Sequence, residues 1–101
     1  MNLKNKALEE LAAKGNVKAA RWLINKYFDS NLLIVHRWTR VLADKGEAHA
    51  QYNLACDYEN GKGFPKNLLL AVKWYKAAAK QGFASALLNL GICYAKGRGV
   101  K

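Results

Sequence analysis

The fold is decided by the stretch Gly46-EAHAQYNLACDY-Glu59, because a related stretch follows it 36 residues later as Gly82-FASALLNLGICY-Ala95. A third copy precedes them at an offset of 31 residues, as Gly15-NVKAARWLINKY-Phe28. The shorter offset has a local cause, because the first copy is followed only by the turn Asp29-Ser-Asn31, and the second by the longer turn Asn60-GKGF-Pro65. Self-similarity at a fixed period of this length indicates a chain of stacked structural repeats.

Each copy places small and apolar residues at helical spacing. In the middle copy, Ala50, Leu54, Ala55 and Tyr58 lie on one side of a helix with 3.6 residues per turn. Small residues beside the central leucine, as at Ala55, are expected to let a neighbouring helix approach closely. The third copy has Gly91 at that position.

A second helical segment separates the copies, since Trp38-TRVLADK-Gly46 aligns with Trp74-YKAAAKQ-Gly82. The repeating unit is therefore a helix pair, and the glycine that ends it suits a left-handed helix cap. We expect an all-α chain. The predicted helices span 3–14, 17–28, 32–45, 48–59, 67–81 and 84–95.

At this point the chain resembles a known family, the Sel1-like repeat, a relative of the tetratricopeptide repeat. The resemblance rests on Leu54-Ala55, Gly61-Lys-Gly63, Trp74-Tyr75 and Gln81-Gly82, with Leu90-Gly91 opening a further unit. It implies a right-handed superhelical α-α solenoid that acts as a protein–protein adaptor, mostly in bacteria. We expect one domain over 1–101, with a degenerate helix at 1–15, a degenerate repeat at 16–46, a full repeat at 47–82 and a partial repeat at 83–101.

The first helix of each pair lines the concave groove of such solenoids, where partners usually lie. Removing the packing stripe leaves a set of side chains predicted to bind a partner. Within it, Tyr52, Leu88 and Ile92 form either an apolar contact patch or additional core. The predicted groove residues are Lys18, Arg21, Asn25, His49, Tyr52, Cys56, Glu59, Ser85, Leu88, Ile92 and Lys96.

Charge is unevenly distributed along the chain. Residues 1–59 hold nine Lys/Arg and seven acids, a net charge of +2, whereas residues 60–101 hold eight Lys/Arg and no acid, a net charge of +8. Lys73, Lys76 and Lys80 fall on one face of a helix. They form either a solvated face or a basic strip that binds an acidic protein or nucleic acid.

The sequence offers no catalytic constellation. His36 and His49 lack metal-ligand spacing to each other or to a cysteine, and Gly61-Lys-Gly63 lacks the strand and the Ser/Thr of a phosphate loop. Cys56 and Cys93 are too few for a disulfide framework and are expected to be free thiols, buried or half-buried. We therefore expect no enzymatic activity, cofactor or metal.

These observations predict a small cytosolic adaptor, regulator or inhibitor of the immunity-protein type, whose partner is an acidic protein or peptide. The cytosolic location is an expectation, because the basic residues at the start of the sequence are not followed by the apolar segment of a signal peptide, and no apolar run approaches the length needed to span a membrane. The alternative is a nucleic-acid or polyanion binder that uses the basic C-terminal half. Because the third repeat lacks its second helix, the side around Leu87, Leu90 and Tyr94 is expected to self-associate, swap a helix or dock on a partner.

Overall fold

The structure, a computed structural model, describes residues 3–61 and 65–100, and it is helical as the sequence predicts. Each helix begins and ends within one residue of its predicted limits. Residues 62–64 of the predicted glycine-rich turn lie outside the described residues. The helices are α1 (Leu3–Ala13), α2 (Val17–Tyr27), α3 (Leu32–Asp44), α4 (Ala48–Asn60), α5 (Leu68–Lys80) and α6 (Ala84–Lys96).

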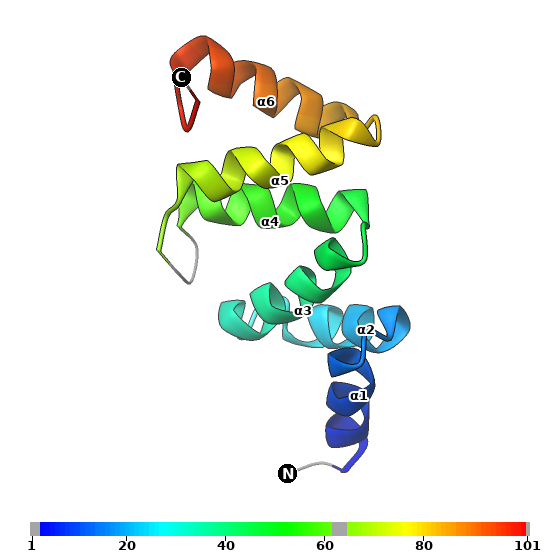
Figure 1. Cartoon of the computed structure of the whole chain (residues 1–101). Coiled ribbons are helices and arrows are strands. Elements are labelled where there is room, and N and C mark those ends of the chain that lie inside the picture. Colours follow the sequence, from blue (N-terminus) through cyan, green and yellow to red (C-terminus); the bar gives the residue numbers. More distant parts are fainter. Residues whose placement is uncertain (1–2, 62–64, 101) are drawn as a thin grey trace.

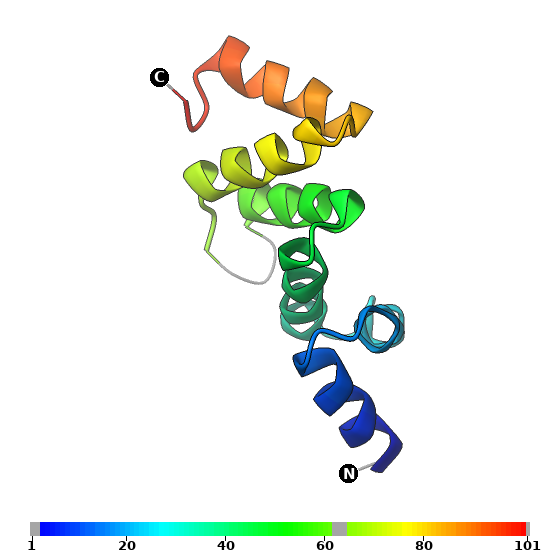
Figure 2. The same cartoon turned by 45° about the vertical axis from the view of Figure 1, so that its right-hand side comes forward.

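The helices form an elongated stack of 48 × 25 × 18 Å, with α1 at one end and α6 at the other (Figure 1). Each helix packs mainly against its neighbours in sequence. In Figure 2, α2 is seen nearly end-on while α4 and α5 run across the view, so the helix pairs are rotated relative to one another. The core is therefore a continuous seam along the stack.

Short polar and glycine signals set the helix limits. The side-chain oxygens of Asn16, Asn31 and Asn67 each accept the backbone N–H three residues later, at 2.9, 3.2 and 3.0 Å. These bonds satisfy donors that a helix start leaves unpaired. Gly46 and Gly82, which follow α3 and α5, have φ values of 93° and 80°. Only glycine adopts this left-handed backbone without cost, so the predicted caps are confirmed at both positions.

The core contains the predicted stripe. Leu23 and Leu54 are fully buried at the same position of α2 and α4, and Trp38 and Trp74 are buried on α3 and α5. Tyr75 is also fully buried, although its position beside the basic strip gave no such indication in the sequence. Its side chain lies between α4 and α6, where it contacts Tyr52 and Glu59 of α4 and Asn89 of α6.

The prediction of a close helix approach at Gly91 is wrong for the described part of the chain. Ala55 is fully buried, but Gly91, its equivalent 36 residues later, is exposed, and an added Cβ there would have no other atom within 4 Å. The difference arises because α5 follows α4 and covers it, whereas no described helix follows α6.

Candidate functional site

A groove between α2 and α4 brings together three of the predicted partner-binding residues. Arg21 and Asn25 of α2 and His49 of α4 line a pocket of about 180 Å³. The guanidinium of Arg21 forms an ion pair with Glu47, at the start of α4, so its charge is largely neutralised. Lys18 is exposed on α2 and forms no ion pair with any carboxylate of the described residues.

A larger pocket of about 380 Å³ adjoins this groove and shares Ile24, Phe28, Thr39 and Asn53 with it. It extends to Leu32 and Val35, at the start of α3. This pocket was not predicted from the sequence. The shortened turn Asp29-Ser-Asn31 between α2 and α3 was a feature of the sequence that could have indicated it. The connection between α2 and α3 has only four residues, 28–31, and Phe28 and Asp29 from it line the pocket.

A polar network connects α4, α5 and α6. The Tyr75 hydroxyl donates to a carboxylate oxygen of Glu59 at 2.8 Å and lies 3.4 Å from the sulfur of Cys56. The side-chain amide of Asn89 donates to the same hydroxyl at 3.2 Å, and Arg98 lies 3.6 Å from Glu59. Burial, reinforced by the bonds to Cys56 and Glu59, raises the pKa of Tyr75 far above its usual range. The hydroxyl therefore remains a donor.

This network changes the interpretation of two predicted groove residues. Cys56 and Glu59 are half-buried and contact Tyr75, so both connect α4 to α5, and Cys56 also lines the 380 Å³ pocket. Both cysteines are free thiols, Cys56 half-buried and Cys93 buried, as predicted. Burial raises the pKa of the Cys93 thiol, which favours its neutral form.

The apolar trio is divided between packing and exposure. The Tyr52 ring is half-buried, with its centroid 5.2 Å from that of Phe83 and 5.9 Å from that of Tyr75. Leu88 and Ile92, one turn apart on α6, are 65% and 42% exposed. Ser85 and Lys96 are exposed on the same helix.

The exposed residues of α6 correspond to residues of α4 that lie against neighbouring helices. Leu88 and Ile92 lie 36 positions after Tyr52 and Cys56, both of which contact Tyr75 of α5. Leu87 and Tyr94, each 52% exposed, lie 36 positions after a buried and a half-buried residue of α4. The predicted apolar patch and two of the residues on the predicted uncovered C-terminal side, Leu87 and Tyr94, are therefore parts of one surface. The prediction is wrong for Leu90, which is half-buried and packs against the core. We call this surface the open face of α6 and define it as Leu87, Leu88, Gly91, Ile92 and Tyr94.

The basic strip lies beside the open face. Lys73, Lys76 and Lys80 are exposed and line a pocket of about 510 Å³, whose apolar wall includes Leu69 and Ala77. We call this pocket the basic pocket. No ion pair joins these three lysines to a carboxylate of the described residues.

The two aromatic residues nearest the strip differ in access. The ammonium of Lys76 lies 5.9 Å from the centre of the exposed Tyr94 ring, so the basic pocket and the open face are contiguous. The Trp74 ring, in contrast, is only 7% exposed, with the Arg40 guanidinium 5.3 Å from its centre and the Lys73 ammonium 5.5 Å away. Trp74 is thus a core residue, as predicted.

Neither histidine lies in a catalytic or metal-binding arrangement. The His36 ring packs edge-on to Tyr58, with 5.4 Å between centroids, while His49 lies against Phe83 at 5.7 Å. Across residues 3–61 and 65–100, no three His, Cys, Asp or Glu side chains are grouped so that they could hold a metal ion. None of the described helices has the length and apolar content needed to cross a membrane.

Comparison with known proteins gives a consistent result. A family model described as the Sel1 repeat matches residues 48–83 and 84–101, just over half of the chain. A search of curated protein sequences found no match.

Two solved structures are similar over almost the whole chain. A Sel1 repeat protein from Oxalobacter formigenes is 35% identical with a TM-score of 0.78, and the match covers 94% of this chain and 75% of that one. The second is c5321, a protective antigen present in uropathogenic Escherichia coli strains that displays an SLR fold. It is 38% identical with a TM-score of 0.80, and the match covers 99% of this chain but only 22% of that protein.

Proposed function

This chain belongs to the Sel1 repeat family, and we propose that it binds a segment of another protein along α6 and the adjoining groove of first helices. The fold is an all-α solenoid of Sel1-like repeats, and repeats of this family generally serve as protein-interaction modules. The proposal assigns this chain a binding role and no catalytic one.

The exposure of Leu88 and Ile92 is the observation that carries the proposal. Two large apolar side chains one turn apart, 65% and 42% exposed, form part of a wider apolar face that includes Leu87 and Tyr94. Contiguous apolar surface of this kind typically marks a site of protein–protein contact. A partner or a second copy of the chain that covers this face would remove it from water.

The charges around the groove favour an acidic partner. Glu47 and Glu59 are each paired with an arginine, Arg21 and Arg98 respectively, whereas two further acids, Asp29 and Asp57, line the adjoining pocket. Lys18 and Lys96 remain exposed at the two ends of the groove. The groove therefore presents unpaired positive charge beside apolar surface, which suits an acidic segment.

Within this proposal the protein is a cytoplasmic adaptor, regulator or immunity-type inhibitor. The two free cysteines are in keeping with a reducing compartment, because proteins of oxidising compartments commonly use their cysteines in disulfides.

Affinity purification from native cells with three forms of the protein tests the proposal. The wild type and Leu33→Asp are expected to recover the same partner, because Leu33 is 61% exposed on α3, outside the groove. Leu88→Asp is expected to lose it. Equal recovery of the same proteins by Leu88→Asp would contradict binding through α6.

The polyanion alternative rests on one observation, the exposure of Lys73, Lys76 and Lys80 without a carboxylate partner in the described residues. The buried Trp74 ring weakens it, because it offers no face on which a base could stack. Binding of a labelled oligonucleotide that falls steeply as salt rises would support this alternative. Absence of binding at low salt would exclude it.

A further inference from the structure

Thr39 of α3 stands at the position that Tyr75 occupies in α5, because Trp38-Thr39 aligns with Trp74-Tyr75. The Tyr75 side chain is fully buried and fills the space between α4 and α6. Thr39 is also buried but has no ring, so α3 leaves the equivalent space between α2 and α4 unfilled. The two pockets of about 180 and 380 Å³ meet at this residue.

The four residues that contact Tyr75 all have counterparts around this space. Three lie on α4, with counterparts 31 residues earlier, and the fourth lies on α6, with its counterpart 36 residues earlier on α4. All four counterparts line the pocket of about 180 Å³, as Thr39 does. Tyr52, Cys56, Glu59 and Asn89 correspond to Arg21, Asn25, Phe28 and Asn53 respectively. We call the two pockets together the Thr39 cavity and define it by Arg21, Ile24, Asn25, Phe28, Thr39 and Asn53.

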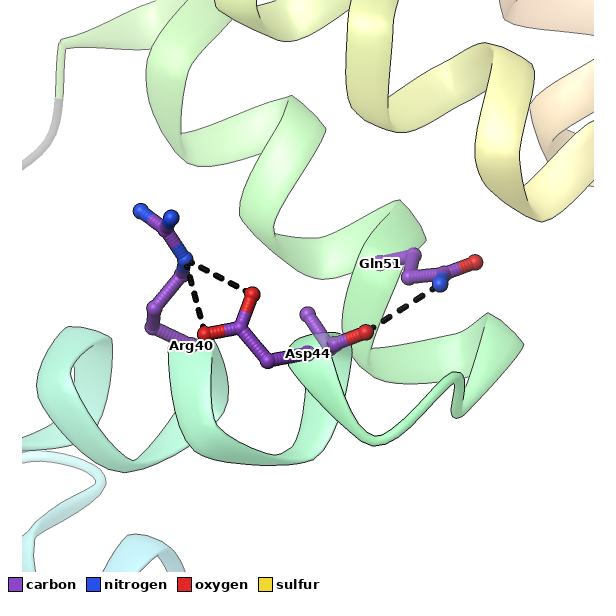
Figure 3. A network of polar contacts seen from close by, with 4 residues as sticks. Arg40, Asp44 and Gln51 are labelled. Atoms are coloured by element: carbon purple, nitrogen blue, oxygen red, sulfur yellow. Dashed lines mark hydrogen bonds and ion pairs between the residues drawn. The ribbon is translucent and has the colours of Figure 1, made fainter.

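Contacts between the helices hold the walls of the Thr39 cavity apart. The ion pair of Arg21 with Glu47 connects α2 to the start of α4. The buried side-chain amide of Gln51, on α4, donates to the backbone carbonyl of Ala43 on α3 at 3.1 Å, as Figure 3 shows. A packed structure relaxes only partly around a missing side chain, so the space stays open where the ring is absent.

The lining of the cavity suits an aromatic ring. The Phe28 ring is 62% exposed and Ile24 is half-buried, so an incoming ring would find an apolar wall and an aromatic partner. The guanidinium of Arg21, at the place of the Tyr52 ring, can stack on an aromatic face. An apolar cavity of about 150 Å³ is large enough to hold benzene, and both pockets exceed that volume.

Polar groups of the cavity favour a ring that carries a hydroxyl. The side-chain amide of Asn89 donates to the Tyr75 hydroxyl at 3.2 Å, and Asn53 is its exposed counterpart. The acceptor differs, because the counterpart of Glu59 is Phe28. The exposed carboxylate of Asp29, the next residue, lines the larger pocket and can accept a phenolic proton instead.

We propose that the Thr39 cavity binds a tyrosine side chain of another protein, whose ring takes the place that Tyr75 fills one repeat later. This inference rests on the proposed protein-binding function and identifies the residue that the partner inserts.

A second copy of this chain is a poorer source of that tyrosine. Tyr94 is the only exposed tyrosine among the residues that the structure describes, and the Lys76 ammonium lies 5.9 Å from its ring centre. Inserting it would bring together two chains that each carry a net charge of +10.

Titration of the ¹⁵N-labelled protein, followed by its amide chemical shifts, tests the inference with three probes. These are acetyl-Gly-Tyr-Gly-amide, the same peptide with phenylalanine, and 4-methylphenol, which is the tyrosine side chain as a free molecule. The tyrosine peptide is expected to bind with a Kd on the order of 1 mM and to shift the amides of Thr39 and Asn53. The phenylalanine peptide is expected to bind about threefold more weakly, because it lacks the hydroxyl. We expect 4-methylphenol to bind no more tightly than the tyrosine peptide.

Three variants locate the binding. Thr39→Tyr fills the cavity from α3 and is expected to abolish binding of the tyrosine peptide. Thr39→Val, which leaves the cavity unfilled, is the matched control and is expected to bind as the wild type does. Asn53→Ala, at an exposed position, is expected to remove the preference for tyrosine over phenylalanine. Circular dichroism of each variant establishes that its helical content is that of the wild type.

Four results would overturn the inference. The first is no binding of the tyrosine peptide to folded wild-type protein, and the second is unchanged binding by folded Thr39→Tyr. Binding of 4-methylphenol without the tyrosine peptide would assign the cavity to a free aromatic molecule. Sedimentation of the protein alone as a dimer that Thr39→Tyr dissociates would assign it to a second copy.

Failure of this inference is distinguishable from failure of the proposed function, which depends on the partner that Leu88→Asp loses. Thr39→Tyr is expected to recover less of that partner from native cells than Thr39→Val does. If Thr39→Tyr recovers as much of it as the wild type, protein binding stands and insertion of a tyrosine is excluded.

Discussion

The hydroxyl of Tyr75 on α5 donates a 2.8 Å hydrogen bond to the carboxylate of Glu59 on α4, and this bond joins the two helices of the full repeat. The donor belongs to a fully buried ring, and the acceptor also pairs with Arg98, which follows α6. One carboxylate therefore holds together groups from three consecutive parts of the stack.

Tyr75→Phe is expected to reduce the free energy of unfolding by about 2 kcal/mol, because a half-buried carboxylate loses a hydrogen-bond donor while the ring is retained. Urea denaturation followed by circular dichroism measures the change. Tyr94→Phe is the matched control, since that ring is 52% exposed, and a change within about 0.5 kcal/mol is expected. Equal effects of the two substitutions would contradict a structural role for the Tyr75 bond.

Leu54→Ala is expected to reduce the free energy of unfolding by about 3 kcal/mol, because Leu54 is fully buried in α4 and its truncation leaves a cavity in the seam. Leu33→Ala, at a position 61% exposed on α3, is expected to change it by no more than about 0.5 kcal/mol. The same denaturation experiment compares them. A small effect at Leu54 would mean that the core does not run through this position.

The same substitution is expected to have opposite effects at two glycines. Gly46→Ala places a side chain on a residue with φ of 93° and is expected to destabilise the protein by about 1–2 kcal/mol. Gly91→Ala lies within α6, where an added Cβ would have no other atom within 4 Å, and is expected to stabilise it by about 1 kcal/mol. Thermal denaturation of both variants checks the signs. Destabilisation by Gly91→Ala would show that another molecule or segment packs closely against that position.

Stability is expected to fall as pH decreases below 6.5. Burial, together with the nearby Arg40 charge, lowers the pKa of His36 from its ordinary value of 6.5. Below 6.5 the unfolded chain therefore binds a proton at His36 that the folded chain takes up only at lower pH, which favours unfolding. Urea midpoints between about pH 7.5 and 5.5 measure this dependence. His36→Gln is expected to reduce it. A larger reduction by His49→Gln than by His36→Gln would show that His49, and not His36, causes the pH dependence.

The sequence was sufficient for most of the fold because the relevant signals are local. Spacing along the chain sets the helical stripe of Ala50, Leu54 and Ala55, and backbone sterics set the glycine caps at Gly46 and Gly82. The repeat also places Trp38 and Trp74 in the core, because equivalent positions of stacked units have equivalent surroundings.

Equivalent residues differ in burial at α6, because no described helix follows it in the stack. There only the tertiary structure decided which residues are buried. Gly91 and Ala55 occupy the same position of their repeats, yet one is exposed and the other fully buried. Likewise, the sequence predicts Cys56 and Glu59 only as groove residues, whereas the structure shows that both contact Tyr75 of the next helix. A helix's own sequence shows which side is apolar, but whether that side is covered depends on the neighbours that pack against it.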